Sequence, residues 1–197
     1  MPRQAAMVRS WMLAVALGLV CPVAAQCAIA ARAAARPSGV LLDVPYFRQI
    51  KPNACGAASL AMLVQYWKNQ KGSAPGAVPN ESAIDRQLDP GDRGIANTAM
   101  VRYLRAAGFR VFAFSGRWND LRENLAKGRP LIVALGPHGK RGPFHYVVVA
   151  GIDWRRNLVF LNDPAQRKLF PMDRGRFLRE WAATGYWTLL AVPKVTV

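Results

Sequence analysis

Three polar side chains of this 197-residue chain stand at the ends of apolar segments. Cys55 lies near the start of a segment whose apolar residues recur at helical spacing, which predicts a helix over 54–67. His145 lies near the start of a long apolar run, and Asp163 directly follows the next one. A thiol, an imidazole and a carboxylate are the groups of nucleophilic catalysis, in which the imidazole activates the thiol and the carboxylate orients the imidazole.

Cys55 is expected at a helix start, with Asn53 as the residue that caps the helix. Backbone N–H groups and the helix dipole favour a negative charge there, so the position suits a reactive thiolate. Gly56, Ala57 and Ala58 are small and leave room for another chain to approach. The alternative is a buried structural cysteine that acts as a small apolar side chain.

His145 belongs to a predicted strand over 144–152, and a hydrogen-bonded strand-end histidine is the alternative to a catalytic one. The only other histidine, His138, lies in a Gly- and Pro-containing loop, where a solvated side chain is expected. Asp163 follows a predicted strand over 158–162 and precedes a proline, so its alternative role is to form a turn. His145 is therefore the better candidate base.

Strand pairing provides a reason to place these two side chains together. If the connection over about 153–157 has an odd number of residues, the paired positions have an even sum. Asp163 then lies opposite Val147 or His145 and projects from the same face as His145. Gln49, six positions before the cysteine, adds a side-chain amide that could donate to an oxyanion.

The remaining elements predict an α+β fold, because helices dominate the first half of the chain and antiparallel strands the second. The expected strands cover 40–44, 109–114, 131–135, 144–152, 158–162 and 187–192. The expected helices cover 54–67, 81–88, 98–107, 120–127 and 173–183.

Composition excludes several classes of protein. With 52% hydrophobic and 19% charged residues, the chain can bury a core and is not globally disordered. Two His and three Cys cannot build a zinc finger or a dense disulfide scaffold. No apolar run of membrane-spanning length occurs in the body of the chain, which excludes a multi-span membrane protein.

The charge is strongly positive, with 27 Lys and Arg against 11 Asp and Glu, a net charge of +16. Such a chain is attracted to acidic partners whatever its fold. The basic residues are scattered and form no recognisable nucleic-acid reader, so we expect no nucleic acid as a partner. An anionic envelope surface is the expected partner by charge.

The N-terminus has the pattern of a secretory signal peptide. Residues 1–10 contain two arginines and no acid, and residues 11–25 form a short apolar run that ends in small residues. Cleavage fits after Ala25 or after Ala30, and an uncleaved membrane anchor is the alternative. We therefore expect a signal peptide over 1–30, a basic linker over 31–39 and one domain over 40–197, exported to the periplasm or the exterior.

The cleavage point decides which cysteines remain. Cleavage after Ala30 leaves Cys55 alone, whereas cleavage after Ala25 also leaves Cys27. In an oxidising compartment Cys27 could then pair with Cys55. A lone thiol in an exported protein is a candidate reactive group.

Four segments of the chain form a recognisable set: Val44-Pro45-Tyr46-Phe47-Arg48-Gln49, Cys55-Gly56-Ala57-Ala58-Ser59-Leu60-Ala61-Met62, Phe144-His145-Tyr146-Val147-Val148-Val149 and Asn162-Asp163-Pro164-Ala165. Together they resemble the bacteriocin-processing, double-glycine peptidases, a family of papain-like cysteine peptidases with a C39-like peptidase domain. A later segment, 172–181, also suits the closing pattern of the family. The resemblance spans about 40–193 and implies the papain-like fold.

The resemblance implies a role for each candidate residue. Cys55 would be the nucleophile, His145 the general base and acid, and Asp163 the residue that orients His145. Gln49 and the backbone N–H of Cys55 would form the oxyanion hole. The implied reaction is hydrolysis of a peptide or protein, after Gly-Gly in a precursor, with no metal and no cofactor.

The best-known members of that family are N-terminal domains of peptide-exporting ABC transporters. This chain is more similar to an exported, stand-alone branch, whose partners could include an export system. Some relatives of the transporter domains lack the cysteine and only bind peptides. The alternative function is therefore a non-catalytic, cationic module of the same fold that binds peptides or the envelope.

Overall fold

The structure, a computed structural model, describes residues 38–70, 80–89, 91–137 and 144–194. The predicted signal peptide and most of the predicted linker lie outside the described residues. The helices of the described part are α2 (Cys55–Asn69), α3 (Glu81–Leu88), α4 (Asn97–Ala106), α5 (Trp118–Ala126) and α6 (Arg174–Ala182). Its strands are β1 (Gly39–Leu41), β2 (Phe109–Ser115), β3 (Leu131–Leu135), β4 (His145–Asp153), β5 (Leu158–Asn162), β6 (Phe170–Asp173) and β7 (Trp187–Pro193).

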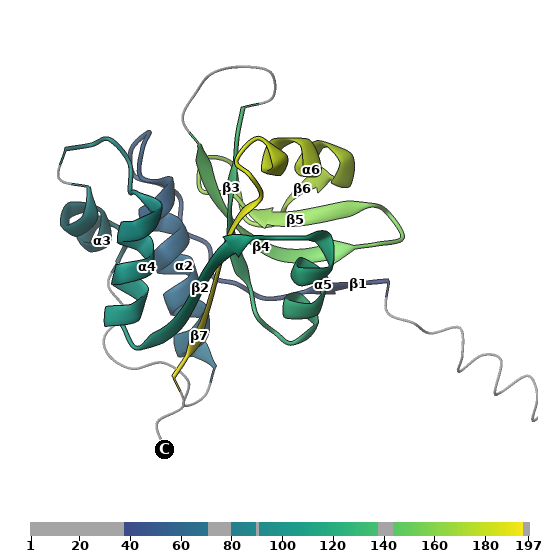
Figure 1. Cartoon of the computed structure of the whole chain (residues 1–197), viewed down its shortest axis with the longest axis horizontal. Helices are drawn as coiled ribbons and strands as arrows, with labels where there is room; N and C mark the ends of the chain where they lie inside the picture. The colour runs from purple at the N-terminus through teal and green to yellow at the C-terminus, as the bar shows by residue number, and fades with distance from the viewer. Residues whose placement is uncertain (1–37, 71–79, 90, 138–143, 195–197) are drawn as a thin grey trace, which may run out of the picture. The chain divides into compact units, whose positions relative to one another are not determined.

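One antiparallel sheet organises the described residues, with the strand order β2-β7-β3-β4-β5-β6 (Figure 1). β3 pairs with the first half of β4, from His145 to Val149, and β1 pairs with the second half, from Gly151 to Asp153. Every pairing in this sheet is antiparallel, so the α+β class predicted from the sequence is confirmed. No helix within the described residues is long and apolar enough to cross a membrane.

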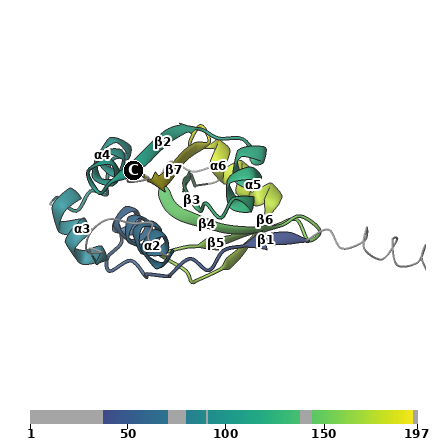
Figure 2. The same ribbon diagram turned by 90° about the horizontal axis from the view of Figure 1, so that it is seen from below.

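The two faces of the sheet are covered by different helices (Figure 2). Tyr146, Val148 and Ala150 of β4 belong to the core formed with α2 and α4. Val147 and Val149, which alternate with them, belong to the core formed with α5 and α6. This alternation follows from the period of two in a strand, and burial on both faces explains why β4 is apolar between its polar ends, from Tyr146 to Ile152.

The hairpin between β4 and β5 differs from the predicted one. Its turn, 154–157, has four residues, so the pairs beside the turn have an odd sum, not the predicted even one. A bulge at Ala150 then shifts the register, and beyond it Val148 pairs with Asn162, which is an even sum. The bulge thus shifts the pairing register of β5 against β4. It produces the register that brings Asp163 to the histidine at the start of β4.

The structure differs from the prediction at several element boundaries and contains one strand that was not predicted. β1 ends at Leu41, whereas the apolar pattern predicts a strand to residue 44. α5 begins at Trp118 instead of 120. β6 is not predicted, because it contains Pro171, which weakens a strand prediction. Since β6 is the last strand of the sheet order, a proline is tolerated there.

Candidate active site

The candidate nucleophile is the first residue of α2. The preceding residue, Ala54, caps the helix and offers no side-chain hydrogen bond. The first-turn N–H groups therefore receive no side-chain cap, and together with the helix dipole they favour a thiolate at Cys55. The prediction that Asn53 caps the helix is wrong, because its Nδ2 instead donates to the carbonyl of Asp92 at 2.9 Å.

Close packing holds the start of α2 against the sheet. The side chain of Cys55 is buried, with 7% of the residue exposed. A Cβ added to Gly56 would lie 3.3 Å from Ile95 and 3.4 Å from Tyr146, so a larger residue would push these neighbours apart. Ser59, one turn further along α2, donates to the carbonyl of Tyr146 at 3.2 Å. The small residues after the cysteine thus let α2 approach β4.

His145 and Asp163 meet at the other side of the site. Nε2 of His145 lies 2.7 Å from Oδ1 of Asp163, which also accepts the backbone N–H of Ala165 at 2.9 Å. Asp163 is only 6% exposed. Because Nε2 faces the carboxylate, Nδ1 is the ring nitrogen left to face a thiol. Cys55 lines the same cleft as His145 and contributes to the electrostatics of its imidazole. The three residues predicted from the sequence are therefore brought together.

The electrostatics of this group favour a charged imidazole. Burial works against the protonated form of His145, but hydrogen bonds and charges from Asp163 and Cys55 outweigh it and raise the pKa of His145 to about 9. Burial, with a smaller contribution from the negative charge of Cys55, raises the pKa of Tyr146 to about 12. The Tyr146 hydroxyl donates to Oδ1 of Asn97. Near neutral pH the imidazole of His145 is therefore protonated.

Two clefts flank His145. The first has a volume of about 410 Å³, and its walls come from the segment before α2, the segment 93–96 and the start of β4. Cys55, His145, Phe144 and Tyr146 all line it. The second, of about 500 Å³, lies on the side of Asp163 and the start of α6. Of these two clefts, the first is the one that Cys55 lines.

Gln49 lies close to the site but is engaged elsewhere. Its Nε2 donates to the carbonyls of Lys51 at 3.0 Å and Pro52 at 2.8 Å, two bonds that can use both of its hydrogens. Its backbone N–H donates to Pro164, the residue after Asp163, at 3.1 Å. Oε1 of Gln49 is buried and has no hydrogen-bond partner. The structure thus places Gln49 beside the site without aiming its amide at the thiol.

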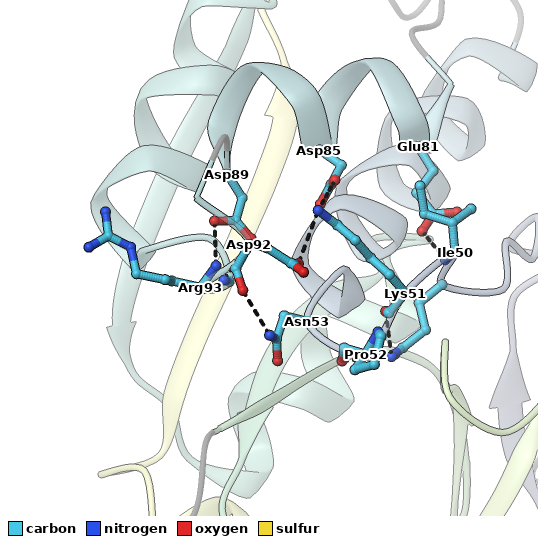
Figure 3. Close-up of polar contacts among 11 residues, drawn as sticks. Ile50, Lys51, Pro52, Asn53, Glu81, Asp85, Asp89, Asp92 and Arg93 are labelled. Carbon is cyan, nitrogen blue, oxygen red and sulfur yellow. Dashed lines mark hydrogen bonds and ion pairs between the residues drawn. The ribbon is translucent and has the colours of Figure 1, made fainter.

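Two features that support the site were not predicted from the sequence. Asn162 is fully buried, and its side chain holds the segment before Gln49 by donating to the carbonyls of Val44 and Pro45. Acidic side chains of α3 contact the loop that leads to Cys55 (Figure 3). No local sequence pattern predicts the contacts of either feature. For Asn162 the one usable signal is its position directly before the candidate Asp163.

The other predicted features have mixed outcomes. His138 and Cys27 lie outside the described residues. Cys55 is a free, buried cysteine. Among the described residues, no group of three or more His, Cys, Asp or Glu side chains could hold a metal ion.

A cysteine at a helix start that faces a histidine and an aspartate on an antiparallel sheet is the arrangement of papain-like cysteine peptidases, and this chain has their fold. It belongs to the Peptidase C39 like family, whose model matches residues 41–189. Membership supports a peptidase function. Among curated proteins, no relative matches the chain.

Solved structures of similar fold include three peptidases. A C39-like peptidase from Bacillus anthracis has a TM-score of 0.64 and 16% identity, covering 81% of this chain and 99% of its own. Xylellain, a cysteine protease from Xylella fastidiosa, has a TM-score of 0.61 and 15% identity, covering 83% and 88%. A double-glycine motif protease from an AMS/PCAT transporter, solved with its leader peptide, has a TM-score of 0.59 and 22% identity, covering 79% and 95%.

Proposed function

We propose that the chain is an exported cysteine peptidase that hydrolyses peptide bonds through Cys55, His145 and Asp163. The observation that carries the proposal is His145, which has a carboxylate on Nε2 and a thiol on its other side. A binding module of the same fold has no need of this pairing. Family membership supports the same reading.

The proposed reaction has two halves. The Cys55 thiolate attacks the peptide carbonyl, the C–N bond breaks, and the His145 imidazolium gives its proton to the leaving amine. The thioester that remains is attacked by water, which transfers a proton to the now neutral imidazole. The C–S bond then breaks, the acid product leaves, and the thiolate–imidazolium pair is restored.

The developing oxyanion needs hydrogen-bond donors. We assign this role to the backbone N–H of Cys55 and to Nε2 of Gln49. Because Nε2 binds two carbonyls in the structure, one of these bonds must be released or shared when a substrate carbonyl arrives. Gly-Gly before the cleaved bond is the specificity that we propose to test first.

A peptide digest tests the proposed function. The protein lacking residues 1–30 is incubated with a mixture of short peptides, with and without Gly-Gly, and the products are identified by mass spectrometry. We expect cleavage by the wild type and none by Cys55→Ala, whose thermal unfolding should match that of the wild type. Equal cleavage by both proteins, or no cleavage by either, contradicts a peptidase that uses Cys55.

A further inference from the structure

The loop before the nucleophile is tied to α3 by side chains that the catalytic mechanism does not use (Figure 3). Three acidic residues of α3 and its end, Glu81, Asp85 and Asp89, recur every four positions. All three are buried, with 6%, 3% and 5% exposed. Carboxylates are rarely buried without partners, so each must be compensated by charge or hydrogen bonds.

Lys51 is the charge that compensates Asp85. Its ammonium lies 2.8 Å from Oδ2 of Asp85 and 3.0 Å from Oδ1 of Asp92. The hydrogen bonds to Asp85 and Asp92 raise the pKa of Lys51 well above its ordinary value, so it stays charged. A metal ion does not fit this cluster, because the ammonium already lies between the two carboxylates and the described residues offer no metal-binding group.

The same cluster fixes the loop on both sides of Lys51. The backbone N–H of Ile50 donates to Oε1 of Glu81 at 2.8 Å. Nδ2 of Asn53 donates to the carbonyl of Asp92 at 2.9 Å. The loop is therefore held at Ile50, Lys51 and Asn53, just before Cys55.

The cluster also holds the opposite wall of the cleft. The two carboxylate oxygens of Asp89 accept the backbone N–H groups of Arg93 at 2.8 Å and Gly94 at 2.7 Å. Arg93 and Gly94 line the cleft that contains Cys55, as do Pro52 and Asn53 from the loop. The end of α3 thus holds this wall, which Asn53 also joins directly to the loop through the carbonyl of Asp92.

The connection to the chemistry runs through Gln49. Its Nε2 is oriented by the carbonyls of Lys51 and Pro52, at 3.0 and 2.8 Å. The ion pairs of Lys51 fix the backbone on which these two carbonyls lie. Any displacement of that backbone moves the amide that we assign to the oxyanion hole.

We propose that Lys51 is a positioning residue, which through Asp85 and Asp92 holds the two carbonyls that keep the Gln49 amide beside the site, where release of one bond lets Nε2 donate to the oxyanion. This inference rests on the proposed function of Gln49. It predicts that loss of the ion pairs weakens stabilisation of the oxyanion while the thiolate–imidazolium pair is left intact.

The test compares Lys51→Met with Lys168→Met. Lys168 also forms a 2.7 Å ion pair, with Asp43, but that carboxylate is 92% exposed and neither residue lines either of the two clefts beside His145. The first readout is the affinity for a peptide aldehyde, acetyl-Gly-Gly-glycinal, whose adduct with Cys55 carries an oxygen at the oxyanion position. The second is the rate at which iodoacetamide alkylates Cys55, a reaction that needs the thiolate but no oxyanion hole.

In Lys51→Met we expect aldehyde affinity and kcat to fall by about 100-fold, as for loss of an oxyanion donor. KM and the alkylation rate should stay within about twofold of the wild type, and Lys51→Arg should restore part of the loss. Lys168→Met should change neither readout. Unchanged aldehyde affinity in Lys51→Met, or an equal fall in alkylation, overturns the proposal.

Two further measurements keep the test decisive. Since Lys51→Met leaves Asp85 buried without its partner, Asp92→Asn serves as a milder variant, because Asp92 is 58% exposed and the bond to Asp85 remains. Hydrogen exchange of the Ile50 amide measures how firmly α3 and Lys51 hold the loop before Cys55, and this measurement needs no catalysis. The exchange should be faster in both variants than in Lys168→Met. An unchanged exchange rate of the Ile50 amide shows that Lys51 does not hold the loop, and this result rejects the proposal even if the wild type is an active peptidase. Faster exchange in a wild type that cleaves nothing and binds no aldehyde rejects the proposed function and, with it, the link to the oxyanion.

Discussion

At the scale of single residues, the site depends on a histidine with a partner on each side. Asp163 fixes the ring through Nε2 at 2.7 Å, and the thiol of Cys55 is the second partner. Removal of the carboxylate leaves an imidazole that still faces the thiol, whereas removal of the imidazole leaves the thiol without an acid or a base. The two substitutions should therefore differ in size and in their pH dependence.

We predict that Asp163→Asn lowers kcat/KM less than His145→Ala, for which a loss on the order of 10²–10⁴-fold is expected. In the wild type, activity should be lost as the pH rises through about 9, because the leaving amine needs the His145 imidazolium. Asp163→Asn removes the strongest contribution that favours the charged ring, so this loss should move to lower pH. An unmoved alkaline limb would mean that another group sets it.

At the scale of elements, the loops that carry the site are held by buried polar side chains from distant strands. Asn162, at the end of β5, is fully buried. Its amide donates to the carbonyls of Val44 and Pro45 at 2.9 and 3.1 Å, and it accepts the N–H of Leu169 at 3.0 Å. One side chain thus joins the segment that leads to Gln49 with the segment that follows Asp163.

We predict that Asn162→Leu lowers the free energy of unfolding by about 3 kcal/mol or more. The substitution leaves two carbonyls and one N–H without partners, and each such buried group costs about 1–3 kcal/mol. Urea unfolding measures the change. The control is Asn69→Leu, whose side chain is exposed at the end of α2. Similar, small effects in both variants would show that Asn162 does not hold these segments.

The sequence predicts the elements and the candidate site residues better than the contacts that position them. Cys55, His145 and Asp163 are recognisable because each interrupts a local pattern. The register that joins the last two depends on a bulge at Ala150, which no turn signal reveals. The bonds from Asn162 to Val44 and from Glu81 to Ile50 join residues 118 and 31 positions apart, so no local spacing could predict them.

At the scale of the whole molecule, the excess of positive charge is the dominant property. Of the 11 acidic residues, several are committed to partners inside the fold, such as Asp163, Asp85 and Asp89. The basic residues are therefore left in excess at the surface. This imbalance supports attraction to an anionic surface and needs no dedicated binding site.

We predict that the protein sediments with vesicles containing anionic lipid and does not sediment with neutral ones. The attraction is carried by exposed charges, so it should disappear as ionic strength rises from about 0.01 M to about 1 M and the Debye length falls from about 30 Å to about 3 Å. Co-sedimentation across this range is the measurement. Binding that survives high salt would indicate a specific site instead of general charge.

The most direct test of the central claim is the rate of Cys55 alkylation by iodoacetamide in the wild type and in His145→Ala, at about pH 6 and about pH 9. Because the pKa of His145 is about 9, its positive charge is present at the lower pH, where the proposed mechanism pairs it with the Cys55 thiolate. We predict that the wild type reacts at pH 6 at a rate close to that at pH 9, and that His145→Ala loses the reaction at pH 6. An ordinary thiol would react about 300-fold more slowly at pH 6 than at its plateau. That result in the wild type would contradict a thiolate–imidazolium pair and the peptidase mechanism built on it.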